Sequence, residues 1–353
     1  MLSTEQLSAT LKPHLNWHGA RLAFLALFLQ ALFQVRTVNL AELATALNPK
    51  AKEASNYRRL QRFFADFALN EDTLARLVVL LLPRPPEGYT LTLDRTTWYL
   101  GQVCLNLLVL GIAHQGVAFP VGVIPLNKEG NSNTLERIAI LEIFISLFGK
   151  ACIHCLTADR EFIGQAWFAY LRQEGSSFRI RVKKNTRIST QPGHMSASAL
   201  FQHLAVDQAL ILTGKRTVWG LELYVIGLKL DNLEFLILVT DQKPVTALAD
   251  YAKRWNIETL FGILKSRGFR FEETHLTNTE RIAKLLALLA LATVWAFKMG
   301  EWLHEQVPLT VKKHGRLAQS IFRYGFNFLR TTVLHLHFKT DDWNKALEVL
   351  SCT

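Results

Sequence analysis

Two aspartates stand at positions where α/β proteins often place catalytic groups. Asp94 follows the run 89–93, which alternates polar and apolar residues, and Asp159 follows the short apolar run 152–158. Charged side chains just past the end of a buried strand are often catalytic, because several strands end at the same edge of a sheet. An aspartate in that place is also a routine helix cap or turn former. Either aspartate alone is therefore a weak indication of a site.

A third carboxylate lies in a segment with a regular pattern of polar residues. The helix predicted over 246–267 carries four such side chains, at spacings of three, four and seven: Tyr251, Arg254, Glu258 and Lys265. At about 100° per residue they fall within about 60° of one another and share one face of the helix. On charge pattern alone, an ordinary ion pair between Arg254 and Glu258, worth about 0.2–0.5 kcal/mol, is the better explanation of the pattern.

A proline-rich segment, 83–88, separates two parts of the chain that have different patterns. Its three prolines and one glycine cannot continue a helix, so it is predicted to be a linker or turn. Residues 1–85 are predicted to be all-helical and hold ten Lys and Arg against six Asp and Glu. The helix predicted over 57–67 has a basic face, which suits either a helix-turn-helix-like DNA reader or the solvated face of a bundle. Its cations are Arg58, Arg59 and Arg62.

After the linker, the patterns predict strands first, then alternating strands and helices, and a helical end. Residues 185–245 are rich in predicted strands. This succession indicates an α/β core with helices on both faces of a sheet. The other predicted elements cover 89–94, 103–112, 117–126, 134–148, 152–158, 161–174, 177–184, 246–267 and 282–306.

The polar residues of the segment 251–265 and the two aspartates resemble those of a known family. The pattern Tyr251-x2-Arg254-x3-Glu258-x6-Lys265 resembles the C-terminal signature of the insertion-sequence-four family of bacterial DDE transposases. Asp94, in Leu-Asp-Arg-Thr-x-Trp, resembles the region of that family's first catalytic aspartate, and Asp159, in Thr-Ala-Asp-Arg-Glu-Phe, that of the second. The resemblance covers about residues 57 to 330.

The resemblance implies an RNase H-like catalytic core with a β-strand insertion, preceded by an all-α region. It implies that Asp94, Asp159 and Glu258 are catalytic and bind two Mg²⁺ ions, for which Mn²⁺ substitutes. Two such ions about 4 Å apart activate a water or 3′-hydroxyl and neutralise the charge of the transition state. Carboxylate oxygens suit these hard cations.

The same resemblance divides the chain. We expect a helical DNA-binding region, a catalytic core in two parts with a β-rich insertion between them, and a C-terminal tail. In that order, these parts are 1–85, 86–184, 185–245, 246–330 and 331–353.

Other motif residues receive supporting roles. By resemblance, Tyr251, Arg254 and Lys265 contact phosphates of the transposon end, where arginine can bind bidentately and lysine acts as a point charge. Trp219, predicted on a strand of the insertion, is either a stacking platform for a flipped base or a half-buried strand residue. Trp98 and Trp255 are predicted to pack.

Two further patterns have simpler interpretations. Cys152 and Cys155 form a C-x-x-C motif that we interpret as part of a buried strand, because no other cysteine completes a zinc site. A basic strand and loop either follows a phosphate backbone or is a solvated face. It contains Arg179, Arg181, Lys183, Lys184 and Arg187.

Composition limits the possible partners. Half of the 353 residues are hydrophobic and a fifth are charged, as in globular proteins, and 40 Lys and Arg exceed 29 Asp and Glu by 11. This surplus favours a polyanionic partner, either nucleic acid or an anionic membrane. The apolar runs 22–35 and 285–297 are predicted to be buried core helices, since each is shorter than a spanning helix. No signal peptide is evident, and cytoplasmic residence is the expectation.

The sequence therefore predicts a DNA transposase that moves an insertion sequence by cut-and-paste transposition. Its expected partners are double-stranded DNA, both inverted repeats and target, and a second copy of the chain. A related nuclease that cuts without joining, and a transposase-derived DNA-binding protein without catalysis, are the alternatives. A membrane-surface protein is disfavoured, because no basic amphipathic interfacial helix is evident.

Overall fold

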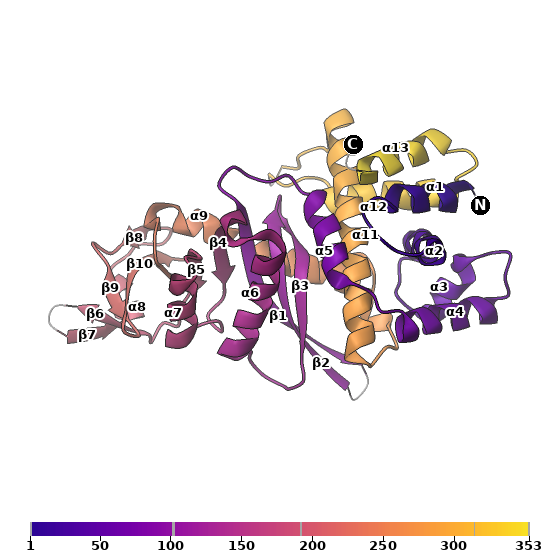
Figure 1. Cartoon of the computed structure of the whole chain (residues 1–353). Helices are drawn as coiled ribbons and strands as arrows, with labels where there is room; N and C mark the ends of the chain where they lie inside the picture. The colour runs from indigo at the N-terminus through magenta and orange to yellow at the C-terminus, as the bar shows by residue number, and fades with distance from the viewer. Residues whose placement is uncertain (1, 101–102, 191–192, 314, 352–353) are drawn as a thin grey trace. The chain divides into compact units, whose positions relative to one another are not determined.

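The computed structural model describes residues 2–100, 103–190, 193–313 and 315–351 (Figure 1). It contains two compact units. The sheet unit comprises residues 84–97 and 106–260, and the helical unit comprises 1–83, 98–105 and 261–353. Each unit is described below by itself.

The sheet unit is built on a mixed sheet with the strand order β3-β2-β1-β4-β5 in its first part (Figure 1). Strands β2 and β3 pair in antiparallel fashion, whereas β4 is parallel to both β1 and β5. These elements are β1 (Tyr89–Leu100), β2 (Val103–His114), β3 (Val117–Leu126), α6 (Thr134–Phe148), η1 (Lys150–Cys152), β4 (Ile153–Ala158), α7 (Gln165–Gln173) and β5 (Phe178–Arg181). The arrangement is the predicted RNase H-like one, with α6 and α7 in the connections that precede β4 and β5.

The predicted β-rich segment continues the same sheet beyond β5. Strand β11 pairs with β5, β10 with β11, and β8 with β10, each in antiparallel fashion. A separate hairpin, β6–β7, and β9 complete this part. The bounds are β6 (Arg187–Thr190), β7 (Gly193–Ser196), α8 (Ala197–Phe201), β8 (Ala209–Ile211), β9 (Arg216–Val218), β10 (Leu221–Lys229) and β11 (Phe235–Thr240).

Strand β1 is longer than the sequence pattern predicts. It extends six residues past Asp94, so that this aspartate lies inside a strand and not at its end. The residues that follow include Thr96, Thr97 and Trp98, whose β-branched and aromatic side chains favour an extended backbone. Asp159, in contrast, directly follows β4, as predicted.

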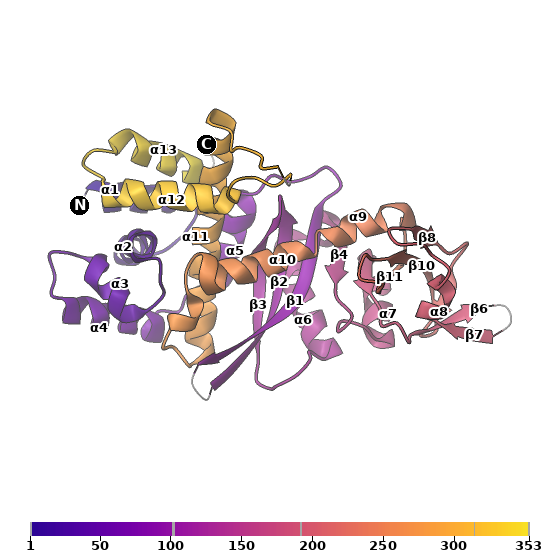
Figure 2. The ribbon, with the colours of Figure 1, turned by 180° about the vertical axis from the view of Figure 1, so that it is seen from behind.

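The helix predicted over 246–267 is interrupted. Helix α9 (Ala247–Ala252) ends at a turn at 253–254, and α10 (Trp255–Gly262) begins after it (Figure 2). The amides of Lys253 and Arg254 donate to the carbonyls three residues earlier, which tightens the chain to 3₁₀ geometry. A 3₁₀ turn, η2 (Pro244–Thr246), precedes α9, and a π-helical turn, η3 (Ile263–Arg267), follows α10. The prediction that one continuous helix carries all four polar side chains on a single face is therefore wrong. Lys265 lies in the π-helical turn that follows α10.

The helical unit packs around one long apolar helix, α11. The helix is long and apolar enough to cross a membrane by composition, but 83% of its most apolar window is buried inside the protein. It contacts α4, α5, α12 and α13, as a predicted core helix should. Helices α2 and α3 together are also long and apolar enough to cross a membrane, although a bend of 111° separates them. Most of the apolar side chains of α2 are likewise buried.

The remaining helices of this unit surround α11. Their bounds are α1 (Leu2–Leu11), α2 (Gly19–Val35), α3 (Leu40–Leu47), α4 (Glu53–Asp66), α5 (Glu71–Leu80), η4 (Phe271–Glu273), α11 (Thr279–Gln306), α12 (Ile321–Leu334) and α13 (Thr340–Ser351).

Two glycines allow α11 and α12 to approach closely. A Cβ atom built on Gly325 would overlap the carbonyl oxygen of Ala296 and the amide nitrogen of Gly300. A Cβ atom on Gly300 would overlap the carbonyl oxygen of Ile321. Because these obstacles are backbone atoms, no side-chain rotation can relieve them.

We therefore expect Gly325→Ala to destabilise the protein by about 1–3 kcal/mol or more, as overpacking does. Urea denaturation followed by circular dichroism measures this change. Gly19→Ala is the matched control, because its Cβ would meet nothing within 4 Å. A helical glycine with free space around it gains up to about 1 kcal/mol on this change. Equal effects of the two substitutions would contradict the close packing.

Candidate active site

Asp94 lies on β1, and Asp159 directly follows β4, the parallel neighbour of β1. Leu93 of β1 is the register partner of Ala158 of β4, so each aspartate directly follows one member of this pair. Each carboxylate accepts a hydrogen bond from the following backbone amide: Arg95 N is 2.8 Å from Asp94 Oδ1 and Arg160 N is 2.7 Å from Asp159 Oδ1. The backbone thereby fixes the orientation of both carboxylates.

Arg254 connects two of the three predicted carboxylates. Its Nη1 lies 3.3 Å from Asp94 Oδ2 and its Nη2 lies 2.6 Å from Glu258 Oε1. The Arg254 side chain is only 6% exposed, whereas that of Glu258 is 41% exposed. Charge-assisted hydrogen bonds of this kind are stronger than neutral ones. The ion pair with Glu258 is thus part of a larger network and more than a surface i, i+4 pair.

Tyr251 reaches the third carboxylate. Its hydroxyl donates to Asp159 Oδ1 across 3.4 Å, and its ring is buried. The backbone carbonyl of Arg254 accepts a hydrogen bond from Thr92 Oγ1 at 3.5 Å, which attaches the turn after α9 to β1. Tyr251 and Arg254 together therefore contact all three carboxylates.

The electrostatics of these groups follow from their burial. The pKa of Asp94 is raised to about 6, chiefly by burial and also by the charges of Glu161 and Asp159, whereas the Arg95 amide and the charge of Arg254 lower it. Burial, with the charge of Asp159, also raises the pKa of the Tyr251 phenol. Burial lowers the pKa of Arg254, but the hydrogen bond to Glu258 and the charges of Tyr251, Asp94 and Asp159 together outweigh burial, and the pKa is raised. Negative charge is thus concentrated here, with a permanent cation inside it.

Two arginines that the sequence analysis did not single out hold the surroundings of the aspartates. Arg95 contacts the Glu161 carboxylate at 3.3 and 3.4 Å and donates to Asn106 Oδ1 at 3.0 Å. Buried Arg137 donates to the backbone carbonyls of Glu161 and Ile163. Both fix the loop that follows Asp159. Their partners in that loop are 24 to 66 residues away in sequence, so no local pattern could have revealed these contacts.

The other predicted site residues are not part of this group. Lys265 belongs to the helical unit, in the π-helical turn, where its Nζ lies 5.5 Å from the ring centre of Trp98. Trp98 is buried, as predicted, but Trp255 is 60% exposed, and the prediction that it packs is wrong. The Cζ atom of Arg254 instead lies 4.9 Å from the centre of the Trp255 ring.

Arg58, Arg59 and Arg62 lie on α4 of the helical unit. Arg58 and Arg62 are exposed and line one hollow of about 610 Å³, together with Lys52. Arg59 is half-buried, with its guanidinium 5.4 Å from the ring centre of Phe24. Two of the three arginines are therefore available to a partner.

Trp219 does not lie on a strand, in contrast to the prediction. It occupies the tight turn between β9 and β10, with φ at 49°, and its ring packs edge-on against Phe168 at 5.4 Å. It lines a hollow of about 510 Å³ that also contains Lys183, Arg187 and His194.

A second group of potential metal ligands lies elsewhere in the sheet unit. His154, Cys155 and Asp250 place one donor atom each within 4.8 Å of one another. However, Arg179 Nε is 3.3 Å and Lys253 Nζ 3.6 Å from the Asp250 carboxylate, so two cations already compensate it. Burial raises the pKa of the Cys155 thiol to about 12, which keeps it protonated. This group is better described as a buried ionic cluster.

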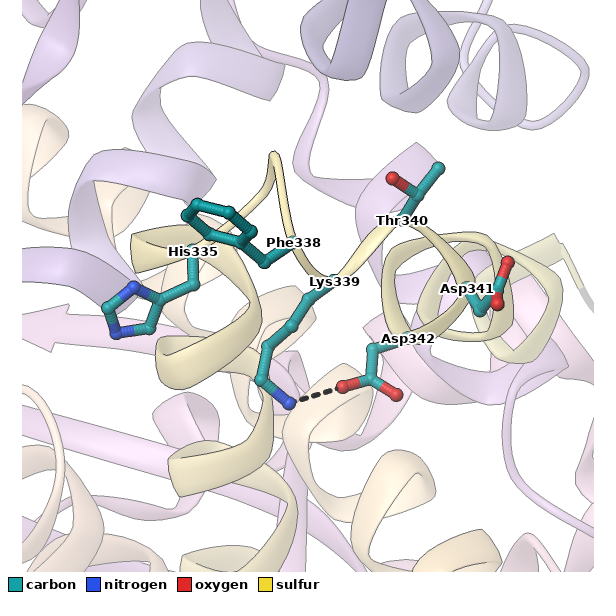
Figure 3. Close-up of a pocket in the computed structure, with 6 residues that line it drawn as sticks. All are labelled: His335, Phe338, Lys339, Thr340, Asp341 and Asp342. Atoms are coloured by element: carbon teal, nitrogen blue, oxygen red, sulfur yellow. Dashed lines mark hydrogen bonds and ion pairs between the residues drawn. The ribbon is translucent and has the colours of Figure 1, made fainter.

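A hollow at the corner between α12 and α13 offers no comparable chemistry (Figure 3). Its volume is about 530 Å³, and its charged groups include Lys339 and Asp342, which pair with each other at 2.6 Å. Phe338 on its rim is 90% exposed. The three carboxylates around Arg254 therefore remain the better candidate for chemistry on DNA.

Comparisons with known proteins give a family match for part of the chain. Residues 122–295, just under half of the chain, match the family model described as "Transposase DDE domain". The matched range includes Asp159, Tyr251, Arg254 and Glu258, whereas Asp94 precedes it. No curated protein matches the chain.

One solved structure with a similar course of the chain is the cryo-EM structure of a piggyBac transposase synaptic complex with hairpin DNA. The two are 12% identical, and the alignment covers 92% of this chain and 73% of that one. The TM-score of the alignment is 0.46.

The family match and the geometry thus lead to one conclusion. Residues 122–295 match the transposase DDE domain, and this match supports the function of a DNA transposase, that is, a polynucleotidyl transferase and nuclease.

Proposed function

We propose that this transposase moves an insertion sequence by a cut-and-paste mechanism, with Asp94, Asp159 and Glu258 as its metal-binding residues. The observation that carries the proposal is the pair of contacts from one buried guanidinium, Arg254, to Asp94 and Glu258. Together with the match of Tyr251, Arg254, Glu258 and Lys265 to the signature, it favours the insertion-sequence-four family.

The three carboxylates suit a pair of Mg²⁺ ions, or Mn²⁺ in their place. All the donors are oxygen atoms, which hard divalent cations prefer. The pKa of Asp94 is raised to about 6 by burial and by neighbouring carboxylates, so the site has more negative charge than Arg254 alone relieves. When bound, such ions lower the pKa of water and neutralise charge on the reacting phosphate.

The chain's own residues have separate tasks. The Tyr251 hydroxyl stays protonated at neutral pH, because burial raises its pKa, and it serves as a hydrogen-bond donor and not as a base. The Arg254 guanidinium is positioned to exchange a carboxylate for a phosphate oxygen of the DNA, since both fit its planar fork. Lys265 adds a further phosphate contact, and Trp219 a surface on which an unpaired base could stack.

Binding of the DNA ends is assigned to the helical N-terminal region. We propose the following division of the chain. Residues 1–85 form the DNA-binding region, 86–184 and 246–330 the catalytic core, 185–245 the insertion and 331–353 the tail. The exposed Arg58 and Arg62 on α4 provide a basic face for the phosphate backbone. Two chains are proposed to pair the two inverted repeats, in the bacterial cytoplasm and at the nucleoid.

The first prediction concerns the metal ligands. Asp94→Asn, Asp159→Asn and Glu258→Gln should each lower Mg²⁺-dependent cleavage of a linear DNA carrying the inverted repeats by about 10²–10³-fold, because each removes a ligand. Binding of the ends should stay within about threefold. Gel analysis of cleavage and mobility shift measures both. Asp231→Asn, an exposed aspartate in the turn between β10 and β11, is the control.

The outcomes of that experiment separate the alternatives. Loss of end binding in all three variants would mean that these residues are structural. Breaks in wild-type protein without specific ends would favour a plain nuclease, and binding without any break in Mg²⁺ or Mn²⁺ would favour a non-catalytic binding protein.

The second prediction concerns stability without metal. Because the folded protein raises the pKa of Asp94 from 3.8 to about 6, the charged carboxylate destabilises the fold above pH 6, and this cost disappears as pH falls toward 4. Asp94→Asn should therefore stabilise the protein in chelator by about 1–3 kcal/mol at pH 7.5 and by much less at pH 4. Thermal denaturation at both pH values tests this. Equal destabilisation at both would contradict it.

The third prediction concerns the basic face of α4. The double change Arg58→Gln and Arg62→Gln should weaken end binding and reduce the slope of log affinity against log salt by about 1–2, since two phosphate contacts are lost. The control is the double change Lys339→Gln and Lys345→Gln, which removes the same amount of positive charge from α13 and from the residue directly before it. An unchanged salt slope in the α4 variant would show that this face does not meet DNA.

A further inference from the structure

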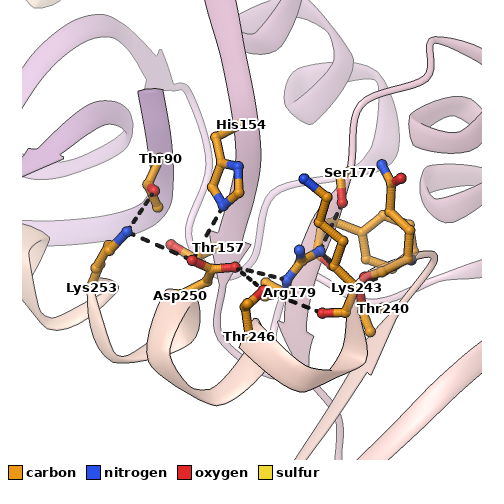
Figure 4. Close-up of polar contacts among 12 residues, drawn as sticks. Thr90, His154, Thr157, Ser177, Arg179, Thr240, Lys243, Thr246, Asp250 and Lys253 are labelled. Atoms are coloured by element: carbon orange, nitrogen blue, oxygen red, sulfur yellow. Dashed lines mark hydrogen bonds and ion pairs between the residues drawn. The ribbon is translucent and has the colours of Figure 1, made fainter. Parts of the chain in front are cut away.

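The buried ionic cluster of the sheet unit centres on Asp250, the residue directly before Tyr251. Asp250 is 5% exposed, and four side chains from different segments surround its carboxylate (Figure 4). The nearest contacts are Thr246 Oγ1 at 3.0 Å, His154 Nε2 and Arg179 Nε at 3.3 Å, and Lys253 Nζ at 3.6 Å. Both carboxylate oxygens therefore have partners.

His154 reaches Asp250 because β4 contains a bulge. The register of β1 and β4 moves from Tyr89–Ile153 to Thr90–Cys155, so His154 is an extra residue on β4. A bulge bends the strand and redirects a side chain, and bulges are frequent beside active sites. Asp159 directly follows the same strand, so the contact from His154 ties Asp250 to the strand that positions a proposed metal ligand.

Arg179 ties Asp250 to the next strands of the sheet. It is fully buried on β5 and donates from Nη1 to Ser177 Oγ at 2.7 Å, to Phe178 O at 2.9 Å and to Thr240 Oγ1 at 2.8 Å. The last contact lies at the end of β11. Contacts with β5 and β11 thus fix the guanidinium in the position in which it pairs with the Asp250 carboxylate on α9.

A buried ion pair of this kind is a weak source of stability, because desolvation offsets the attraction between the charges. Its better-attested use is to fix one arrangement of the elements it joins. Helix α9 needs such a fixation, because it has only six residues and a turn separates it from α10. Helices this short are not stable by themselves.

We propose that Asp250 is a positioning residue of the active site. It holds α9 against β4 and β5 and thereby places Tyr251 at Asp159 and Arg254 between Asp94 and Glu258. The inference depends on the proposed role of the three carboxylates. Asp250 itself touches none of the reacting groups and acts through the backbone that it anchors.

A purely structural role predicts a different result. If Asp250 only stabilised the fold, its loss would lower the fraction of folded protein and leave the metal requirement of the remainder unchanged. If it positions α9, the folded variant has a misplaced Glu258, and the concentration of metal needed for half-maximal cleavage rises. The metal requirement therefore separates the two roles.

The test uses Asp250→Asn in the full chain, which keeps the shape and removes the charge. We expect the Mn²⁺ concentration for half-maximal cleavage to rise by about 10–100-fold, the range seen when outer-shell partners of metal ligands are removed. Direct Mn²⁺ titration followed by electron paramagnetic resonance should show the same shift. Asp250→Glu, which restores the charge, should recover part of it.

Asp241→Asn is the matched control. Its carboxylate accepts hydrogen bonds from Ser177 Oγ and Phe178 N, so it also contacts the start of β5, but it has no contact with α9 among those the structure describes. Its metal requirement should equal that of the wild type. If Asp250→Asn fails to fold, Thr246→Val removes one hydrogen bond to Asp250 and should shift the requirement by about threefold in the same direction.

An unchanged Mn²⁺ requirement in the folded Asp250 variant, or in Thr246→Val if the former does not fold, overturns the inference. The proposed function fails by a different result, namely cleavage and Mn²⁺ binding that persist in Glu258→Gln. The two failures are therefore distinguishable in the same set of titrations.

Discussion

The guanidinium of Arg254 lies among carboxylates that would otherwise repel one another. It compensates Asp94 on β1 and Glu258 on α10 at once, while the neighbouring Tyr251 hydroxyl binds Asp159. Without a cation in this place, burial of Asp94 beside Asp159 and Glu161 would be still more unfavourable. The mixed sheet, the turn after α9 and the arginines around the Asp159 loop all serve to bring these charges to one place.

Much of the scaffold could be predicted because its signals are local. The capping box of Asn133 and Glu136 marks the start of α6, and its predicted range, 134–148, is confirmed. The alternating and apolar runs likewise predict β2, β3 and β4 to within about two residues. These elements are specified by residues within one or two turns of each other, which is the range over which sequence patterns carry information.

The site could be predicted only in part, because its geometry depends on distant residues. The spacing in the segment 251–265 predicts that Tyr251, Arg254 and Glu258 lie close together, as they do, but the turn at 253–254 and the π-helical turn around Lys265 have no signature in charge spacing. The interpretation of Arg179 as a phosphate contact or solvated residue is wrong, since it is fully buried. Its partner Asp250 lies 71 positions away, beyond any local pattern.

The way in which the helical unit is assembled from the two ends of the chain bears on the order of folding during synthesis. Helices α4 and α5 pack on α11, α2 on α12 and α1 on α13, so the N-terminal helices, which also pack on one another, complete their core only when these C-terminal helices have been made. The sheet unit, in contrast, is complete in sequence at residue 260. Since ribosomes add about 5–20 residues per second, the nascent chain has its three acidic residues several seconds before its N-terminal helices can close their core. During that interval the apolar faces of the N-terminal helices that pack on α11, α12 and α13 lack their native cover.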